Sequence, residues 1–283
     1  MAGVTMMLAQ GSVLSELPWS FGSVAAWSAL AIGAGAAGLG WTSRRGAEGT
    51  CCGARACASL FTGLLAFLAF ASPIAVLAEG QLFAAHMLQH ILLLLVVPLG
   101  IVLSLPRERT LRLLDRPSLR PLAALLSMAP LAWLAGVGAM WAWHQPLACS
   151  AALASPAMGA VRDVSFLLAG TFFWWPILGP IPTHRVAPPL GVAYLVSACI
   201  GCTVLGVAVT FAASTPCPVF VEVAAPLPAV ERLRSMGFTP RIDQQTGGLL
   251  MWMLPCLVYL GASVSLLRRW YAAPQPGPVE GLR

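Results

Sequence analysis

Long apolar runs, separated by short polar or arginine-rich stretches, dominate the chain. Seven of these runs approach the roughly 20 residues that an α-helix needs to cross a bilayer. They cover Trp19–Trp41, Cys57–Leu77, Phe83–Leu105, Pro121–Ala142, Gly159–Ile181, Leu190–Ala212 and Gly247–Leu267. The pattern predicts an all-α membrane protein, with one domain over residues 1–283. We expect a bundle of seven transmembrane helices between about residues 19 and 267, with tails at 1–18 and 268–283.

Arginines gather on one side of this arrangement. The loops Thr42–Ala56 and Pro106–Arg120 are rich in arginine, and further arginines follow the last helix. On the other side, arginines occur only in Ala213–Thr246, the longest loop, where the positive-inside rule is weaker. This bias predicts that the N-terminus lies outside and the C-terminus lies in the cytoplasm.

The composition agrees with a membrane protein and excludes some classes. Charged residues make up 9% of the chain and the mean hydropathy is +0.82, whereas soluble domains carry roughly 25% charged residues. The basic residues are all arginine, which excludes a retinal protein because that needs a Schiff-base lysine. We expect no signal peptide, since no basic segment precedes the first apolar run, and no internal repeat points to an inverted-repeat transporter.

Two histidines begin the third apolar segment, in the run His86-Met87-Leu88-Gln89-His90. Residues four apart share one face of a helix. Ionisable side chains within a spanning helix usually face the bundle interior or a wet cavity. In the predicted orientation the third helix enters from outside, so we expect both imidazoles in its outer third, facing other helices.

The same orientation brings other polar residues to this depth. The fourth helix exits outward at Met140 and His144, and the fifth re-enters near Arg162 and Asp163. The seventh re-enters just after Asp243 and the two glutamines that follow it. Four helix ends are therefore predicted to bring His, Met, Asp and Gln together near the outer face.

Imidazoles combined with thioethers form a set of metal ligands that favours copper, because Met sulfur prefers Cu(I). The candidate ligands are His86, His90, His144, Met87, Met140 and Asp163, with Asp243 as a supporting group. Simpler interpretations stay open: the histidines as hydrogen-bonded packing residues, Met87 as a core residue, and Asp163 as the partner of Arg162 in an interfacial ion pair.

Other kinds of metal site require different residues at these positions. A zincin needs Glu directly after its first His, but Met87 occupies that position, so we do not expect an enzyme of this type. Both ligands of a bis-histidine haem cannot come from one helix face, which excludes the His86–His90 pair. His90 with His144 leaves a haem site open.

The eight cysteines show no spacing typical of a disulfide or zinc framework. Cys199-Ile200-Gly201-Cys202 resembles a redox or metal motif, but it lies in mid-helix with no activating charge nearby. We interpret these residues as packing residues, because a free cysteine behaves as a small hydrophobe.

Four motifs together resemble the CtaG family of multi-spanning cytochrome c oxidase assembly factors. They occur in the family's order and span roughly Ala78 to Leu267. They are His86–His90, Trp143-His144-Gln145-Pro146, Ser165-Phe166-Leu167 leading to Phe173–Pro176, and Asp243-Gln244-Gln245 followed by Gly248–Trp252. The resemblance implies a seven-helix membrane protein needed for a functional haem–copper oxidase, with copper handling as the usual explanation.

The chain departs from the family pattern on the fifth helix. The family commonly carries a second His-x-x-x-His there, and the matching positions are Gly159 and Asp163. A carboxylate is a harder ligand than imidazole, so this half of the site should bind Cu(I) more weakly. The site either works with His86, His90 and His144 alone or has become structural.

The sequence thus predicts a copper-handling assembly factor of the bacterial plasma membrane, which holds copper near the outer face and passes it to a cytochrome c oxidase subunit. Its partners would be that oxidase and lipid, with no nucleic acid. The alternatives are a permanent structural subunit of an oxidase complex without its own metal, and a haem-binding electron-transfer protein. Charged residues of the long outer loop would either dock a partner or be solvated: Glu222, Glu231, Arg232 and Arg234.

Overall fold

The computed structural model describes Trp19 and residues 49–272. The first predicted span, Trp19–Trp41, therefore lies almost wholly outside the described residues. Within them, every regular element is helical. The α-helices are α3 (Gly49–Ala71), α4 (Pro73–Ala78), α5 (Phe83–Ile91), α6 (Val97–Ser104), α7 (Arg107–Leu114), α8 (Arg120–Leu126), α9 (Ala129–Trp143), α10 (Pro146–Ala154), α11 (Pro156–Leu178), α12 (Pro188–Phe211), α13 (Pro228–Ser235) and α14 (Pro240–Ala272). A π-helix, η3 (Leu92–Val96), joins α5 to α6, and short 3₁₀ turns lie at η4 (Pro117–Leu119), η5 (Pro182–His184) and η6 (Pro218–Phe220).

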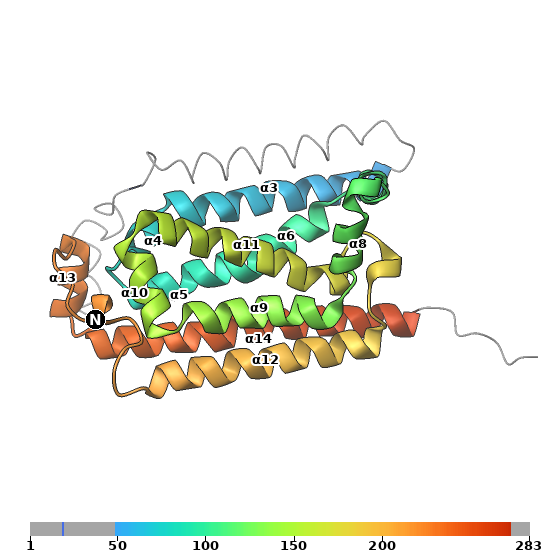
Figure 1. The fold of residues 1–283 in the computed structure, drawn as a ribbon. Coiled ribbons are helices and arrows are strands. Elements are labelled where there is room, and N and C mark those ends of the chain that lie inside the picture. The colour runs from blue at the N-terminus through green and yellow to red at the C-terminus, as the bar shows by residue number, and fades with distance from the viewer. Residues whose placement is uncertain (1–18, 20–48, 273–283) are drawn as a thin grey trace, which may run out of the picture.

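The helices run lengthwise beside one another in a bundle (Figure 1). The continuous unit α5–η3–α6 contacts α3, α11 and α14, while α12 packs along α14 and α9 packs along α11. We call one end of the bundle the histidine end: α5, α11 and α14 begin there, α9 and α12 end there, and the short helices α4, α10 and α13 lie beside it (Figure 1). The opposite end, which carries α7 and α8, is the arginine end.

Three of the described helical stretches are long and apolar enough to cross a membrane: Phe83–Ser104, Pro188–Phe211 and Pro240–Ala272. The pair Pro117–Leu126 and Ala129–Trp143 would make a fourth, although it bends by 71°. Helix α3 contributes a shorter apolar stretch, Arg55–Ala71. Large apolar side chains also point outward, for example Leu64, Leu168 and Leu257 at 52%, 67% and 62% exposure. These features indicate a multi-pass membrane protein.

Prolines lie inside two of the predicted spans, where they are expected to kink the helix. The predicted segment Pro121–Ala142 is broken between α8 and α9, and Pro130 occupies the first turn of α9, where its missing N–H costs no helical bond. The third span stays continuous through η3. There Val97 donates its backbone N–H to Leu92, five residues back, and Pro98 follows, which has no N–H for the Leu94 carbonyl.

Helix α11 packs closely against the third span at η3. The Trp174 indole of α11 donates a 2.9 Å hydrogen bond to the Leu95 carbonyl, and Gly170 of α11 faces the Leu94 carbonyl and the Pro98 ring. Small residues at such crossings let two helix backbones approach closely. The expected kink is therefore a short π-helical insertion against which α11 packs.

The last helix begins earlier in the chain than the sequence predicted. Helix α14 starts at Pro240 rather than at Gly247, so Asp243 lies in its first turn instead of in the preceding loop. An acidic side chain in the first helical turn is favourable because the helix dipole is positive there. The polar composition of residues 240–246 had suggested that they belong to the preceding loop.

The interpretation of the cysteines as unpaired packing residues is wrong for four of them. Cys149 is bonded to Cys217, and Cys199 is bonded to Cys256, with Cα atoms 5.9 and 5.2 Å apart. These separations lie within the range that a disulfide spans. The partners are 68 and 57 residues apart in the sequence, so local spacing carries no sign of either pairing. Cys202, in contrast, is a free and buried thiol.

Candidate functional site

Three histidines meet in the interior of the histidine end. His86 and His90 come from one face of α5, and His144 caps the C-terminus of α9. Their exposed fractions are 1%, 5% and 7%. The ring centroids of His86 and His90 lie 4.2 Å apart, and those of His90 and His144 lie 5.2 Å apart. The predicted convergence of α5 and α9 is thus present in the fold.

Backbone carbonyls fix the orientation of two of the rings. Nδ1 of His86 lies 3.0 Å from the carbonyl oxygen of Ala78, and Nδ1 of His144 lies 2.6 Å from that of Met140. A carbonyl can only accept, so in both rings Nδ1 carries the proton and donates it. Each Nε2 is then left with a lone pair, which is the form in which imidazole binds a metal.

The remaining ring nitrogens either face a sulfur atom or have no hydrogen-bond partner among the described residues. Nε2 of His144 lies 3.3 Å from the sulfur of Met87. Nε2 of His86 and both nitrogens of His90 are buried without a hydrogen-bond partner among the described residues. A buried polar group without a partner costs free energy. Such groups in a native fold call for an explanation, such as an ion or water that satisfies them.

A small cavity of about 30 Å³ opens beside His90 and His144. Its walls include His90, His144, Met87, Met140, Cys202 and Tyr259. A space of this size holds a water molecule or a single ion. It cannot hold a haem, and the direct contact between the His90 and His144 rings leaves no slot for a porphyrin between them.

Two aromatic side chains shield the cluster. The Phe220 ring, from η6, lies 5.1 Å from His86, and the Phe166 ring, from α11, lies 4.7 Å from His90. Both phenylalanines are fully buried. The Cys149–Cys217 disulfide ties the start of η6 to α10. The loop that follows α12 therefore contributes a wall of the candidate site, which charge pattern alone did not indicate.

Asp243 supports the site through the backbone. Its two carboxylate oxygens each accept a 2.9 Å hydrogen bond, from the N–H groups of Phe83 and Ala84 at the start of α5. Arg234 donates to the same carboxylate at 3.2 Å. A carboxylate at a helix N-terminus satisfies donors that have no intrahelical partner. Asp243 therefore positions the helix that carries His86 and His90.

Asp163 is engaged elsewhere. It forms a 2.8 Å ion pair with Arg162, which is itself buried at 7% exposure. This is the interfacial ion pair that the sequence left as an alternative to ligation. The Arg162 guanidinium also lies within electrostatic range of all three imidazoles. In the described part of the chain, no group of three or more His, Cys, Asp or Glu side chains lies close enough together to hold a metal ion.

Sequence reasoning missed Cys202 as a neighbour of the site. The buried positions of α12 include Tyr194, Ala198, Cys202 and Leu205, which follow the helical spacing of three to four residues. A helical projection of this segment would have placed Cys202 on the inner stripe. Cys199 lies off that stripe and pairs with Cys256.

The chain is similar to one family of known proteins. The family model described as cytochrome c oxidase caa3 assembly factor (Caa3_CtaG) matches residues 36–273. The comparisons with curated proteins and with solved structures gave no match. The matched region includes all the described helices and every residue of the candidate site. The chain therefore belongs to the caa3 cytochrome c oxidase assembly factor family.

Proposed function

We propose that this assembly factor handles copper for the cytochrome c oxidase with which its family associates, holding Cu(I) at the histidine end and passing it on. The observation that carries the proposal is the set of free imidazole nitrogens beside a thioether: Nε2 of His86, both nitrogens of His90, and Nε2 of His144 facing Met87. Imidazole and thioether donors together suit Cu(I).

The surroundings also support a transferable ion. The donors belong to neutral side chains, and in the structure three of them are not yet gathered around one position, so binding would have to draw them together. Buried Phe166 and Phe220 keep bulk water from the imidazoles. A site with few ligands in a dry setting can hold an ion and still release it to a partner that offers more ligands.

Replacing both histidines of α5 is expected to abolish copper binding. The detergent-purified protein, loaded anaerobically with Cu(I), should retain copper in the wild type and lose it in His86→Ala/His90→Ala. Metal analysis after desalting provides the measurement. His184→Ala is the matched control: His184 lies at the arginine end and contacts Trp175, so this variant should bind as the wild type does. Equal background copper in all three proteins would remove the copper proposal.

A permanent oxidase subunit without its own metal is the alternative function. The Arg162–Asp163 ion pair favours it to a degree, because the carboxylate in the family's second histidine position is not free to bind an ion. Co-purification in mild detergent separates the two: a stoichiometric complex with the oxidase supports a subunit, whereas transient capture supports a copper donor.

We further propose that the histidine end faces the outside of the plasma membrane. Arginine-rich α7 lies at the opposite end, in agreement with the positive-inside rule. The Cys149–Cys217 disulfide lies at the histidine end, and structural disulfides persist in oxidising compartments such as the periplasm.

Labelling of introduced cysteines in intact cells tests this orientation. Leu147 of α10 is 88% exposed at the histidine end, and Ser118 of η4 is exposed near the arginine end. A membrane-impermeant maleimide should label Leu147→Cys in intact cells, and should label Ser118→Cys only after lysis. The opposite pattern would reverse the orientation.

A further inference from the structure

We propose that Cys202 is the anionic ligand of the copper site, a step that rests on the proposed function and adds the residue that would neutralise the ion. Cys202 lies in the middle of α12, is 2% exposed and lines the same cavity as His90 and His144. None of the histidine motifs points to this residue.

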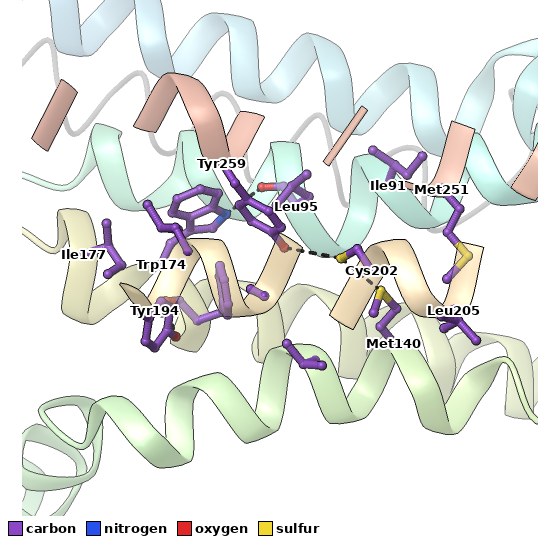
Figure 2. Packing of buried hydrophobic residues seen from close by; sticks show 14 of the residues in the cluster. Ile91, Leu95, Met140, Trp174, Ile177, Tyr194, Cys202, Leu205, Met251 and Tyr259 are labelled. Carbon is purple, nitrogen blue, oxygen red and sulfur yellow. Dashed lines mark hydrogen bonds between the residues drawn. The ribbon is translucent and has the colours of Figure 1, made fainter. Parts of the chain in front are cut away.

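The thiol is surrounded by groups that suit a metal-bound sulfur. Its Sγ lies 3.5 Å from the Met140 sulfur and 3.9 Å from the Tyr259 hydroxyl, as Figure 2 shows. Met140 is itself one helical turn from His144, to which its carbonyl is hydrogen-bonded. The lining of the cavity therefore combines two imidazoles with a thiol–thioether pair. The free ring nitrogens of His90, which is 5% exposed, line the same space.

Charge compensation favours an anionic ligand. An ion in a bundle interior is expensive to bury unless its charge is compensated. Imidazoles and thioethers are neutral, and the nearby Arg162 guanidinium is already balanced by Asp163. A Cu(I) ion bound only by those donors would be a buried, uncompensated cation. One thiolate would reduce the charge of the Cu(I) centre to zero.

The two carboxylates that the sequence placed at the site already have partners. Asp163 is paired with Arg162, while Asp243 accepts from two backbone N–H groups and from Arg234. Tyr259 is the other ionisable side chain on the cavity wall besides the histidines and Cys202, and its phenolate is a hard oxygen ligand. Thiolate is the soft anion that selects Cu(I).

The binding step balances without a redox reaction. Cu(I) displaces the proton of the Cys202 thiol, a Cu–S bond forms, the S–H bond breaks and the proton passes to solvent. Copper stays in the same oxidation state throughout. The Tyr259 hydroxyl, which is within reach of the sulfur, can donate to the thiolate that results. Metal-bound thiols are deprotonated in this way in general.

The experiment uses the full chain with Cys51, Cys52 and Cys57 replaced by serine. Cys149, Cys217, Cys199 and Cys256 are paired, so Cys202 is then the single thiol among the eight cysteines. Cu(I), supplied anaerobically as its acetonitrile complex, is titrated by calorimetry in two buffers of different ionisation enthalpy. A chromophoric Cu(I) chelator measures the affinity in competition. The second protein adds Cys202→Ser, and the wild type controls for the triple replacement.

The parent protein should release about one proton for each Cu(I) bound and show near-ultraviolet Cu(I)–thiolate absorption. Cys202→Ser should release none, lack that absorption and bind Cu(I) at least about tenfold more weakly, since even outer-shell partners of a metal are worth this much. Copper binding without proton release in the parent protein would overturn the assignment, even if Cys202→Ser failed to fold. So would unchanged affinity in a folded Cys202→Ser.

The two proposals fail differently. Suppose that His86→Ala/His90→Ala loses copper and that the parent protein binds Cu(I) without releasing a proton. The copper function then stands, but Cys202 is not a ligand. A wild type that binds no Cu(I) overturns both. Proton-coupled binding that disappears in Cys202→Ser supports both at once.

Discussion

Replacing Asp243 by alanine is expected to destabilise the bundle by about 3–5 kcal/mol, the range measured when one partner of a buried ion pair is removed. The Asp243 carboxylate is completely buried. Its loss leaves the N–H groups of Phe83 and Ala84 without their acceptor and leaves Arg234 without its counter-ion. The first turn of α5, which carries His86, would then fray.

Thermal unfolding in detergent measures the loss of stability, and hydrogen exchange at the amides of Phe83 and Ala84 locates it. Copper binding should fall together with stability because both histidines belong to the affected helix. Asp115→Ala is the matched control, since Asp115 is exposed at the arginine end. An Asp243→Ala protein as stable as that control, with unchanged exchange at the start of α5, would contradict the prediction.

Enlarging Gly170 is expected to separate α11 from the π-helical segment and to cost roughly 1–3 kcal/mol, as overpacking of a close contact usually does. A Cβ at this position would collide with the Leu94 carbonyl and the Pro98 ring. Backbone atoms cannot rotate away as a flexible side chain can, so Gly170→Val must move a whole helix. Phe166, one turn along α11, would lose its contact with His90.

The thermal midpoint and the Cu(I) affinity of Gly170→Val should both fall. Gly138→Ala is the control, because a Cβ at Gly138 meets nothing within 4 Å and alanine favours a helix over glycine. If both variants unfolded at the same temperature, α11 would not depend on the close approach at Gly170.

Several features of the protein follow from local physics, and the sequence determined them. Apolar runs of membrane-spanning length predicted helices that the fold contains, such as Phe83–Ser104 and Pro188–Phe211. The four-residue spacing placed His86 and His90 on one face, and their cost of burial indicated the bundle interior. The predicted order of the helix ends placed His144 at the same depth as His86 and His90. These inferences need only helical periodicity and the low polarity of lipid.

Tertiary structure decided everything that depends on contacts between distant segments. Asp243 was predicted to be a supporting group of the site, and its partners are backbone N–H groups 160 and 159 residues away in the sequence. The disulfides and the place of Cys202 beside Met140 likewise join separate helices. Sequence spacing reports which residues share a helix face, whereas helix packing decides which faces meet.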